Sequence, residues 1–332
     1  MNAQLLREPR PAEESPLEVT DLPVPLPGDD ELLIHVHACG VCHTDLHTVE
    51  GEISAKLPVV PGHQIVGVVE KVGGNVKGFR IGDRVGVPWL HQTCGECEFC
   101  RSDRENLCDR AEFTGFHVNG GYAEYATALA AFAVKIPDNF DDVHAAPLLC
   151  AGIIGFRALR LSNVHPQQTL GLYGFGASAH IAIQIAARWG CEVYVATRGK
   201  EHQRLAKELG ATWVGRAEDL PDSTLHSAVM FAPAGSLVPE ALRALRKGGT
   251  LALAGIYMTP IPELNYERLY HERIVRSVAN ATRDDAWQLM QLAGQIPLRA
   301  EVQTFPLADA NRTLAALKHG KIGGAGVLIV DG

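Results

Sequence analysis

The chain has 332 residues, of which 46% are hydrophobic and 20% are charged, and its formal net charge at pH 7 is −8. A chain of this length exceeds one ordinary hydrophobic core, so we expect two domains. The acidic balance and the lack of a long basic tract argue against broad nucleic-acid binding.

The amino-terminal stretch MNAQLLREPRPAEESP is polar, and the longest apolar run, residues 145–156, is shorter than a membrane-spanning helix requires. We therefore expect a cytoplasmic protein that does not associate with membranes. Its eight cysteines are then better explained as metal ligands or core residues than as disulfides. Cys39 and Cys191 are predicted to be core residues.

Short runs rich in Val, Gly and Pro predict a β-rich amino-terminal unit, with strands in residues 31–38, 63–73 and 78–87. Near residue 150 the pattern changes to strands alternating with helices, which indicates a parallel sheet covered on both faces. The elements predicted there are a strand, a glycine turn and a helix in 170–190, a strand in 191–198, a helix in 200–211 ending at Gly210, a strand in 226–233, a helix in 239–249 and a strand in 250–256. Roughly the last 45 residues are expected to return to turn-rich β-structure and to pack on the first domain.

A cluster of four cysteines, Cys94, Cys97, Cys100 and Cys108, has the spacing C-x2-C-x2-C-x7-C. Four thiolates this close in sequence can close a tetrahedral shell around Zn²⁺, which predicts a structural site without an open position. An iron–sulfur cluster and four free thiols are the alternatives.

A second possible ligand set is spread over the chain and consists of Cys42, His63 and Cys150. Two sulfurs and one imidazole leave the fourth position of Zn²⁺ open, as a catalytic site requires. The spacing alone is also compatible with ordinary buried cysteines.

Three neighbours of Cys42 are candidate catalytic residues. Thr44 could hydrogen-bond a metal-bound alcohol, Asp45 could accept a hydrogen bond from the second ring nitrogen of His63, and His47 could carry a proton to solvent. Ordinary loop capping is the alternative explanation for all three.

The segment GFGASA, residues 174–179, follows an apolar run and precedes a helix. Gly174, Gly176 and Ala179 fit the G-x-G-x-x-A pattern that binds a dinucleotide pyrophosphate at a helix amino terminus. The next strand ends in Thr197 and Arg198 without an acidic residue to bind a ribose 2′-hydroxyl. Arg198 could instead pair with a 2′-phosphate, which slightly favours NADP over NAD.

The chain resembles the zinc-containing medium-chain alcohol dehydrogenases along nearly its whole length. The motifs that carry the resemblance are CHTDLH (42–47), PGHQIVG (61–67), GDRVGVPWL (82–90), the four-cysteine segment, GGYAEYA (120–126), PLLCAG (147–152), YGFGASAH (173–180) and LALAGI (251–256). The resemblance implies an α/β protein with two domains. A GroES-like catalytic domain would comprise residues 1–150 and 284–332, with the structural-zinc lobe at 94–108, and a Rossmann domain with a doubly wound parallel sheet would comprise 151–283.

The resemblance also implies roles for individual residues. Cys42, His63 and Cys150 would hold the catalytic zinc, and Thr44 and His47 would form a proton relay through the cofactor ribose. The remaining implied positions are His43 near the pyrophosphate, Trp89 in the substrate pocket, and Ala254, Gly255, Ile256, Ser277 and Ala279 on the nicotinamide side of the cofactor.

Three positions depart from the family pattern. Gln64 replaces a glutamate, Ile154 replaces a threonine, and Ala325 stands where many members have an arginine. We predict a zinc-dependent enzyme that exchanges hydride between a primary or secondary alcohol or aldehyde and NAD(P), in a homo-oligomer, either a dimer or a tetramer. The alternatives are a zinc-containing, cofactor-binding redox sensor without alcohol turnover and a zinc-free quinone or enoyl reductase.

Overall fold

The structure is a computed structural model that describes residues 1–330. The chain forms two compact units. The first comprises residues 1–150 and the segment from Thr282 onward, and the second comprises Ala151–Ala281. The chain thus returns to the first unit two residues before the expected position, 284.

The first unit is built mainly from antiparallel strands. Its seven-stranded sheet has the order β16-β17-β3-β4-β5-β9, with β8 paired to β3, and two small sheets pair β1 with β2 and β6 with β7. The elements are β1 (Asn2–Leu6), β2 (Leu17–Asp21), β3 (Glu31–Val41), α1 (His43–Glu50), β4 (Ile65–Val72), β5 (Arg84–Val87), β6 (Leu90–Gln92), β7 (Glu112–Phe113), β8 (Tyr125–Leu129), β9 (Val134–Lys135), α2 (Asp142–Ala145), α7 (Arg283–Ala293), β16 (Val302–Pro306), α8 (Ala310–Lys318) and β17 (Ala325–Ile329).

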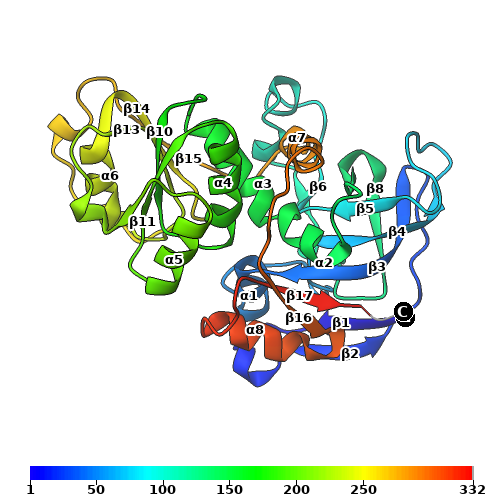
Figure 1. The fold of residues 1–332 in the computed structure, drawn as a ribbon. Helices are drawn as coiled ribbons and strands as arrows, with labels where there is room; N and C mark the ends of the chain where they lie inside the picture. Colours follow the sequence, from blue (N-terminus) through cyan, green and yellow to red (C-terminus); the bar gives the residue numbers. More distant parts are fainter. Residues whose placement is uncertain (331–332) are drawn as a thin grey trace. The chain divides into compact units, whose positions relative to one another are not determined.

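The long strand β3 organises this sheet. Its 11 residues pair with β17, β4 and β8, all antiparallel. Figure 1 shows β17, from the end of the chain, lying against β3 from its beginning. Alternating Val, Ile and Leu side chains place one side of β3 in the core, and the strand ends one residue before Cys42.

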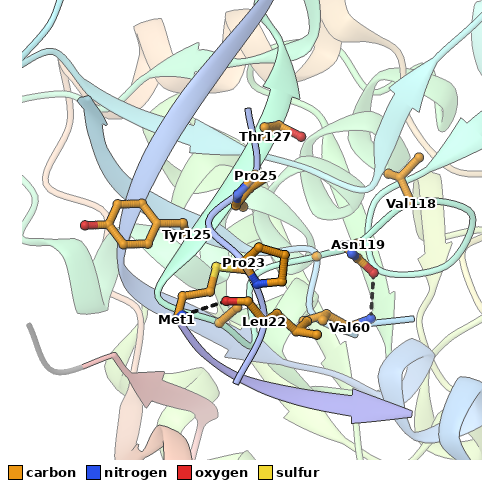
Figure 2. A pocket seen from close by; sticks show the side chains of 12 residues that line it. Met1, Leu22, Pro23, Pro25, Val60, Val118, Asn119, Tyr125 and Thr127 are labelled. Atoms are coloured by element: carbon orange, nitrogen blue, oxygen red, sulfur yellow. Dashed lines mark hydrogen bonds between the residues drawn. The ribbon is translucent and has the colours of Figure 1, made fainter. Parts of the chain in front are cut away.

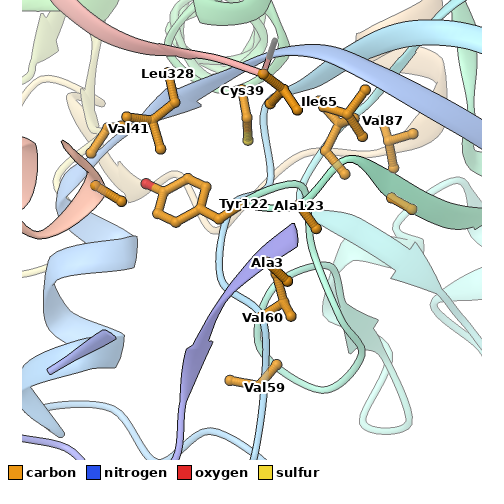
Figure 3. Packing of buried hydrophobic residues seen from close by; sticks show 14 of the residues in the cluster. Ala3, Cys39, Val41, Val59, Val60, Ile65, Val87, Tyr122, Ala123 and Leu328 are labelled. Carbon is orange, nitrogen blue, oxygen red and sulfur yellow. The ribbon is translucent and has the colours of Figure 1, made fainter. Parts of the chain in front are cut away.

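The core of the first unit surrounds Tyr122, whose side chain is fully buried. Figure 3 shows its ring among side chains from β3 and β17, including Val41, Leu328 and Cys39. Each fully buried aliphatic or aromatic side chain contributes about 1.5–3 kcal/mol to stability. Cys39 is fully buried here, which confirms the prediction of a core cysteine.

The second unit is a six-stranded sheet in the order β12-β11-β10-β13-β14-β15, and every neighbouring pair is parallel. Helices α3, α4 and α5 lie on one side of this sheet and α6 lies on the other (Figure 1). This doubly wound arrangement confirms the predicted fold class of this region. Its elements are α3 (Ala151–Leu161), β10 (Thr169–Tyr173), α4 (Ala177–Arg188), β11 (Glu192–Ala196), α5 (Lys200–Glu208), β12 (Trp213–Gly215), β13 (Leu225–Met230), α6 (Val238–Ala244), β14 (Leu245–Leu253) and β15 (Ile274–Ser277).

The sheet order reverses at β10, because β11 and β12 lie on one side of this strand and β13 to β15 on the other. In parallel sheets, ligands bind at the carboxyl ends of the strands near such a reversal. The glycine turn at Gly174 follows β10 directly and therefore lies at this position.

Several predicted elements are wrong in extent or type. The helix expected in 239–249 ends at Ala244, and residues 245–249 belong to β14, because Leu245 pairs with Leu225 before the register shifts. In 78–87 only Arg84–Val87 is a strand. The last part of the chain contains helices α7 and α8 in addition to its strands. Buried residues such as Leu289 in α7 and Leu314 in α8 give each helix an apolar face. The prediction missed both helices because the glycines around them indicated turns.

No single helix among residues 1–330 is both long and apolar enough to cross a membrane. Only the pair Asp142–Leu149 and Ala151–Leu161 passes that test, and only when the two are taken together.

Candidate active site

The structure brings Cys42, His63 and Cys150 together, with their ligand atoms within 4.8 Å of one another. Cys42 follows β3 and His63 precedes β4, and the antiparallel register pairs Cys39 with Ile65. Residues just beyond the end of β3 therefore lie beside those just before β4. Cys42 Sγ lies 3.3 Å from His63 Nε2.

Cys150 reaches this group from the short helix η5 (Ala146–Leu149), which it terminates. The helix packs on β5 so closely that a Cβ on Gly86 would lie 2.6 Å from the Leu149 side chain. Leu148 and Leu149 are buried, so apolar packing fixes the position of the third sulfur.

The two sulfurs and the imidazole form a buried set of metal-binding side chains. A hydrogen bond from the Cys150 thiol lowers the pKa of Cys42 well below its ordinary value, and the same bond raises the pKa of Cys150. If both cysteines lose their protons, the buried site gains two negative charges, which a divalent cation can balance. Two sulfurs and a histidine nitrogen are ligands that Zn²⁺ prefers, so these residues fit a zinc site.

Asp45 supports the group from behind. Its side chain is 1% exposed and accepts hydrogen bonds from His63 Nδ1 at 3.0 Å and from the backbone N–H of Cys42 at 2.9 Å. Because a carboxylate only accepts, Nδ1 of His63 carries the hydrogen and Nε2 is left as the ligand atom. The charges of Asp45 and Cys42 raise the pKa of His63 well above its ordinary value, although burial by itself would lower it.

Three of the other predicted residues of this region lie on α1, and the fourth, Trp89, lies between β5 and β6. The backbone N–H of Thr44 donates to Cys42 Sγ at 3.2 Å, and its own side chain is partly exposed. His43 is exposed, and its ring lies 6.4 Å from the ring of His47. Trp89 packs against His63 with ring centroids 4.8 Å apart. All four therefore lie close to the ligand group in sequence or in space.

The four-cysteine lobe gathers its sulfurs within 4.8 Å of one another. Cys94 Sγ lies 3.8 Å and Cys97 Sγ 3.5 Å from Cys100 Sγ, and the backbone N–H of Cys97 donates to Cys94. Zinc–sulfur bonds of about 2.3 Å in a tetrahedron place sulfurs about 3.8 Å apart. The cluster therefore fits a closed Zn²⁺ shell.

A salt bridge that the sequence did not reveal ties this lobe to α7. Glu105 is 6% exposed, and its carboxylate accepts from Nε of Arg283 at 3.0 and 2.9 Å and also from the backbone N–H of that residue. The guanidinium also lies over the ring of Phe132, 4.5 Å from its centroid. The two charged residues are 178 positions apart, so no local pattern pointed to this contact.

The predicted dinucleotide loop has the expected strand–turn–helix geometry. Gly174 has φ +84°, and a Cβ there would lie 2.7 Å from the backbone nitrogen of Ala232, so only glycine fits this turn. Gly176 is the N-cap of α4, and among the described residues no atom lies within 4 Å of where its Cβ would be. Ala179 is fully buried. The open backbone at a helix amino terminus fits a pyrophosphate group.

The other predicted cofactor residues lie at the carboxyl ends of the neighbouring strands. Thr197 and Arg198 follow β11, the first buried and the second exposed. The remaining residues follow or end β14 and β15, and they are Ala254, Gly255, Ile256, Ser277 and Ala279. Because all strands of this sheet run in the same direction, these residues share one edge of it.

Two polar residues near this edge were not predicted. His180, in the first turn of α4, is 8% exposed, and burial lowers its pKa to about 4. Its ring packs on Phe175 inside the glycine loop, with centroids 4.6 Å apart. Gln203 of α5 donates from Nε2 to the Thr197 carbonyl at 2.8 Å. Both stabilise the loops that would surround a cofactor, and the only sequence signal was their proximity to the glycine motif.

The three departures from the family pattern have different surroundings. Gln64 is 3% exposed, and its Oε1 lies 2.7 Å from where a Cβ on Gly40 would be. Ile154 lies in α3 and is partly buried, and Ala325 begins β17 opposite Val302. All three are accommodated without removing a predicted metal ligand.

A cavity of about 360 Å³ lies beside the amino terminus, and Met1, Leu22 and Asn119 are among the residues that line it. Figure 2 shows the Met1 amine donating to the carbonyl of Leu22 at 2.6 Å and the Val60 N–H donating to Asn119 Oδ1 at 3.0 Å. Of the residues that the structure describes, those lining this cavity include none of the predicted site residues, so we do not assign it to the active site.

Comparisons with known proteins agree with this geometry. Residues 28–138 match the family model of the alcohol dehydrogenase GroES-like domain, and residues 179–295 match that of the zinc-binding dehydrogenases. The first match includes the four-cysteine lobe, and the second identifies a zinc-binding family, so together with the grouped sulfurs they support zinc in the lobe.

Curated relatives and solved structures cover nearly the whole chain. The probable alcohol dehydrogenase AdhA of Mycobacterium tuberculosis is 47% identical over 99% of this chain and 97% of its own. An alcohol dehydrogenase of Geobacillus stearothermophilus is 36% identical over 96% of this chain and 97% of its own. The cobalt- and zinc-bound thermostable alcohol dehydrogenase of Pyrobaculum aerophilum superposes with a TM-score of 0.88 at 27% identity, covering 99% of both chains.

The two curated relatives are named as a probable alcohol dehydrogenase and an alcohol dehydrogenase, so neither a redox sensor nor a zinc-free reductase is supported. Since the two ligand groups, the GroES-like and Rossmann-type units and the full-length similarity all agree, the chain belongs to the zinc-containing medium-chain alcohol dehydrogenase family.

Proposed function

We propose that this protein catalyses reversible hydride transfer between a primary or secondary alcohol, or the matching aldehyde or ketone, and NAD or NADP. The observation that carries this proposal is the convergence of Cys42, His63 and Cys150, backed by Asp45, in a chain 47% identical to a probable alcohol dehydrogenase.

Cys42, His63 and Cys150 would hold the catalytic zinc, and Cys94, Cys97, Cys100 and Cys108 would hold the structural zinc. When bound, the catalytic zinc supplies a Lewis acid for the substrate oxygen, and the nicotinamide ring supplies the redox capacity. Trp89, which packs on His63, would exclude water from one side of this group.

We assign the proton transfer to Thr44 and His47. The Thr44 hydroxyl, two residues from Cys42, would accept the proton that the alcohol gives up. His47 would pass it to water, since its side chain is 24% exposed and an imidazole nitrogen can both accept and release a proton. Asp45 keeps the tautomer of His63 fixed throughout.

The cofactor would bind along the carboxyl edge of the parallel sheet. The N–H groups after Gly176 at the start of α4 would bind the pyrophosphate. Residues 254–256 with Ser277 and Ala279 would contact the nicotinamide side.

The test of the function is a panel of primary and secondary alcohols and their carbonyl products with each cofactor, followed by nicotinamide absorbance at 340 nm. We expect turnover with at least one pair and about two zinc ions per chain. A chain that holds two zinc ions but turns over no member of the panel would contradict the proposal.

A prediction about cofactor choice concerns Arg198, which is exposed where β11 gives way to α5. Arg198→Ala should raise KM for NADPH about tenfold and leave KM for NADH within about twofold, because only NADPH offers a phosphate to the guanidinium. The matched control is Arg204→Ala on α5, where the arginine pairs with Glu201 and Glu208. Equal effects of Arg198→Ala on both cofactors would refute the 2′-phosphate assignment.

We also propose that the chain forms a homo-oligomer and works in the cytoplasm. The edge strand β15 and the segment before it expose Ile274 and Tyr270, and a second copy could cover such an edge. All eight cysteines lie within residues 1–330, and none of them forms a disulfide there, which suits a reducing compartment.

A further inference from the structure

The ring of His47 faces a carboxylate that the proposed relay does not use. Nδ1 of His47 is hydrogen-bonded to Glu52, a residue just beyond the end of α1. The contact depends on how the helix terminates, because Glu52 returns toward the helix instead of continuing away from it.

The turn at Gly51 produces this return. Gly51 is the C-cap of α1 with φ +74°, and a Cβ there would lie 2.9 Å from Cβ of Pro9. The backbone N–H of Glu52 donates to the His47 carbonyl at 3.0 Å. The backbone of Glu52 therefore binds the His47 carbonyl, which holds Glu52 at the helix end, and its side chain binds the imidazole.

Of the two acidic residues at this end of α1, only Glu52 contacts the ring. The carboxylate of Glu50 accepts hydrogen bonds from Lys318 at 2.8 Å and from the backbone N–H of Ala12 at 3.0 Å, so its partners are groups other than the His47 ring. The side chain of Glu52 is 58% exposed, whereas that of His47 is 24% exposed.

The hydrogen bond determines which ring nitrogen can take a proton. An ionised carboxylate has no hydrogen to donate, so Nδ1 of the neutral ring must carry the hydrogen. Nε2 is then unprotonated and has a free lone pair. An acidic side chain that fixes a histidine in this way is a recurring means of defining the reactive nitrogen.

We propose that Glu52 is a positioning residue for proton transfer: it holds His47 in the Nδ1–H tautomer, so that Nε2 is the atom that receives the relayed proton. The proton from the substrate forms a bond to Nε2, and water then removes it, so the ring returns to its starting state. This inference rests on the proposed function, because the relay through His47 is part of it.

The first test measures the tautomer directly. In the zinc-loaded wild-type protein with ¹⁵N-labelled histidine, long-range ¹H–¹⁵N correlation spectra at pH 8 should show His47 as the Nδ1–H form, with its signals identified by their loss in His47→Gln. In Glu52→Ala the acceptor is gone, so the population should move toward the Nε2–H form. A wild-type ring in the Nε2–H form would overturn the proposal.

The second test measures catalysis. Glu52→Ala should lower kcat for alcohol oxidation about tenfold with little change in KM, and Glu52→Gln, which keeps an oxygen acceptor, should recover part of this loss. In the His47→Gln background, Glu52→Ala should have no further effect. An equal loss in both backgrounds would show that Glu52 only stabilises the loop, and would overturn the proposal.

The matched control is Glu8→Ala, because Glu8 is an exposed carboxylate next to Pro9 at the same turn. It should change neither the spectrum nor kcat. The two proposals fail differently: a wild-type protein without alcohol turnover contradicts the proposed function, whereas turnover that is unaffected by Glu52→Ala contradicts only the role of Glu52.

Discussion

Cys42→Ser is expected to lower kcat by about a thousandfold and to reduce the zinc content from two ions per chain to one. The variant removes one sulfur from a three-residue ligand set whose remaining members cannot hold the ion tightly. His63→Ala should have the same effect on zinc and activity. The expected reason is loss of the Lewis acid, not loss of the fold, because the core around Tyr122 does not include either side chain.

The two variants differ in their cost to stability. His63→Ala leaves the carboxylate of Asp45 buried without its ring partner, which costs about 1–3 kcal/mol, whereas Cys42→Ser keeps that hydrogen bond. Cys42→Ser is therefore the cleaner experiment. Zinc is counted by elemental analysis of the dialysed protein, and kcat is measured with the best substrate of the panel.

The control for both is Cys191→Ser, because Cys191 is a buried cysteine of the second unit outside both ligand groups. It should keep two zinc ions and full turnover. Full turnover in Cys42→Ser, or loss of both zinc ions from it, would contradict the assignment of the two sites.

The second large effect is expected from Cys100→Ser in the four-cysteine lobe. This variant should also bind one zinc ion per chain, but retain the catalytic one. Its melting temperature should fall by about 10 °C, corresponding to about 3 kcal/mol for a unit of this size, because binding energy of a structural zinc is folding energy.

The loss should spread beyond the lobe through Glu105. This buried carboxylate belongs to the lobe, and it binds Arg283 at the start of α7, where the chain returns to the first unit. Hydrogen exchange should therefore increase in α7 as well as in residues 94–108. Wild-type protection and melting temperature in a variant that lacks the lobe zinc would refute a structural role for it.

Motifs that act over short stretches of chain could be predicted from the sequence. The four cysteines lie within one loop, and the G-x-G-x-x-A segment needs only the strand before it and the helix after it. In both cases the backbone between the residues is too short to allow many arrangements, so spacing alone implies geometry. The alternation of strands and helices after residue 150 could be predicted for the same reason, because each element follows from the pattern of a short stretch of chain.

Elements near changes of pattern were predicted less well. The run Leu245–Gly249 has helix-forming residues before its glycines, yet it belongs to β14. Leu245 pairs with Leu225 of β13, and after a register shift the pairing resumes at Thr250, so contacts with the adjacent strand override the local preference. Helices α7 and α8 were missed because the surrounding glycines and prolines suggested turns. Tertiary packing of their buried leucines decides their conformation.

Contacts between distant parts of the chain were decided by the tertiary structure alone. Cys42, His63 and Cys150 were expected to meet chiefly because of the family resemblance; the physical cause is the register of β3 with β4 and the packing of η5 on β5. The pairing of Glu105 with Arg283 and the turn that brings Glu52 to His47 left no trace in composition or spacing. Spacing limits only how far apart two residues can be, whereas burial and register determine which of them touch.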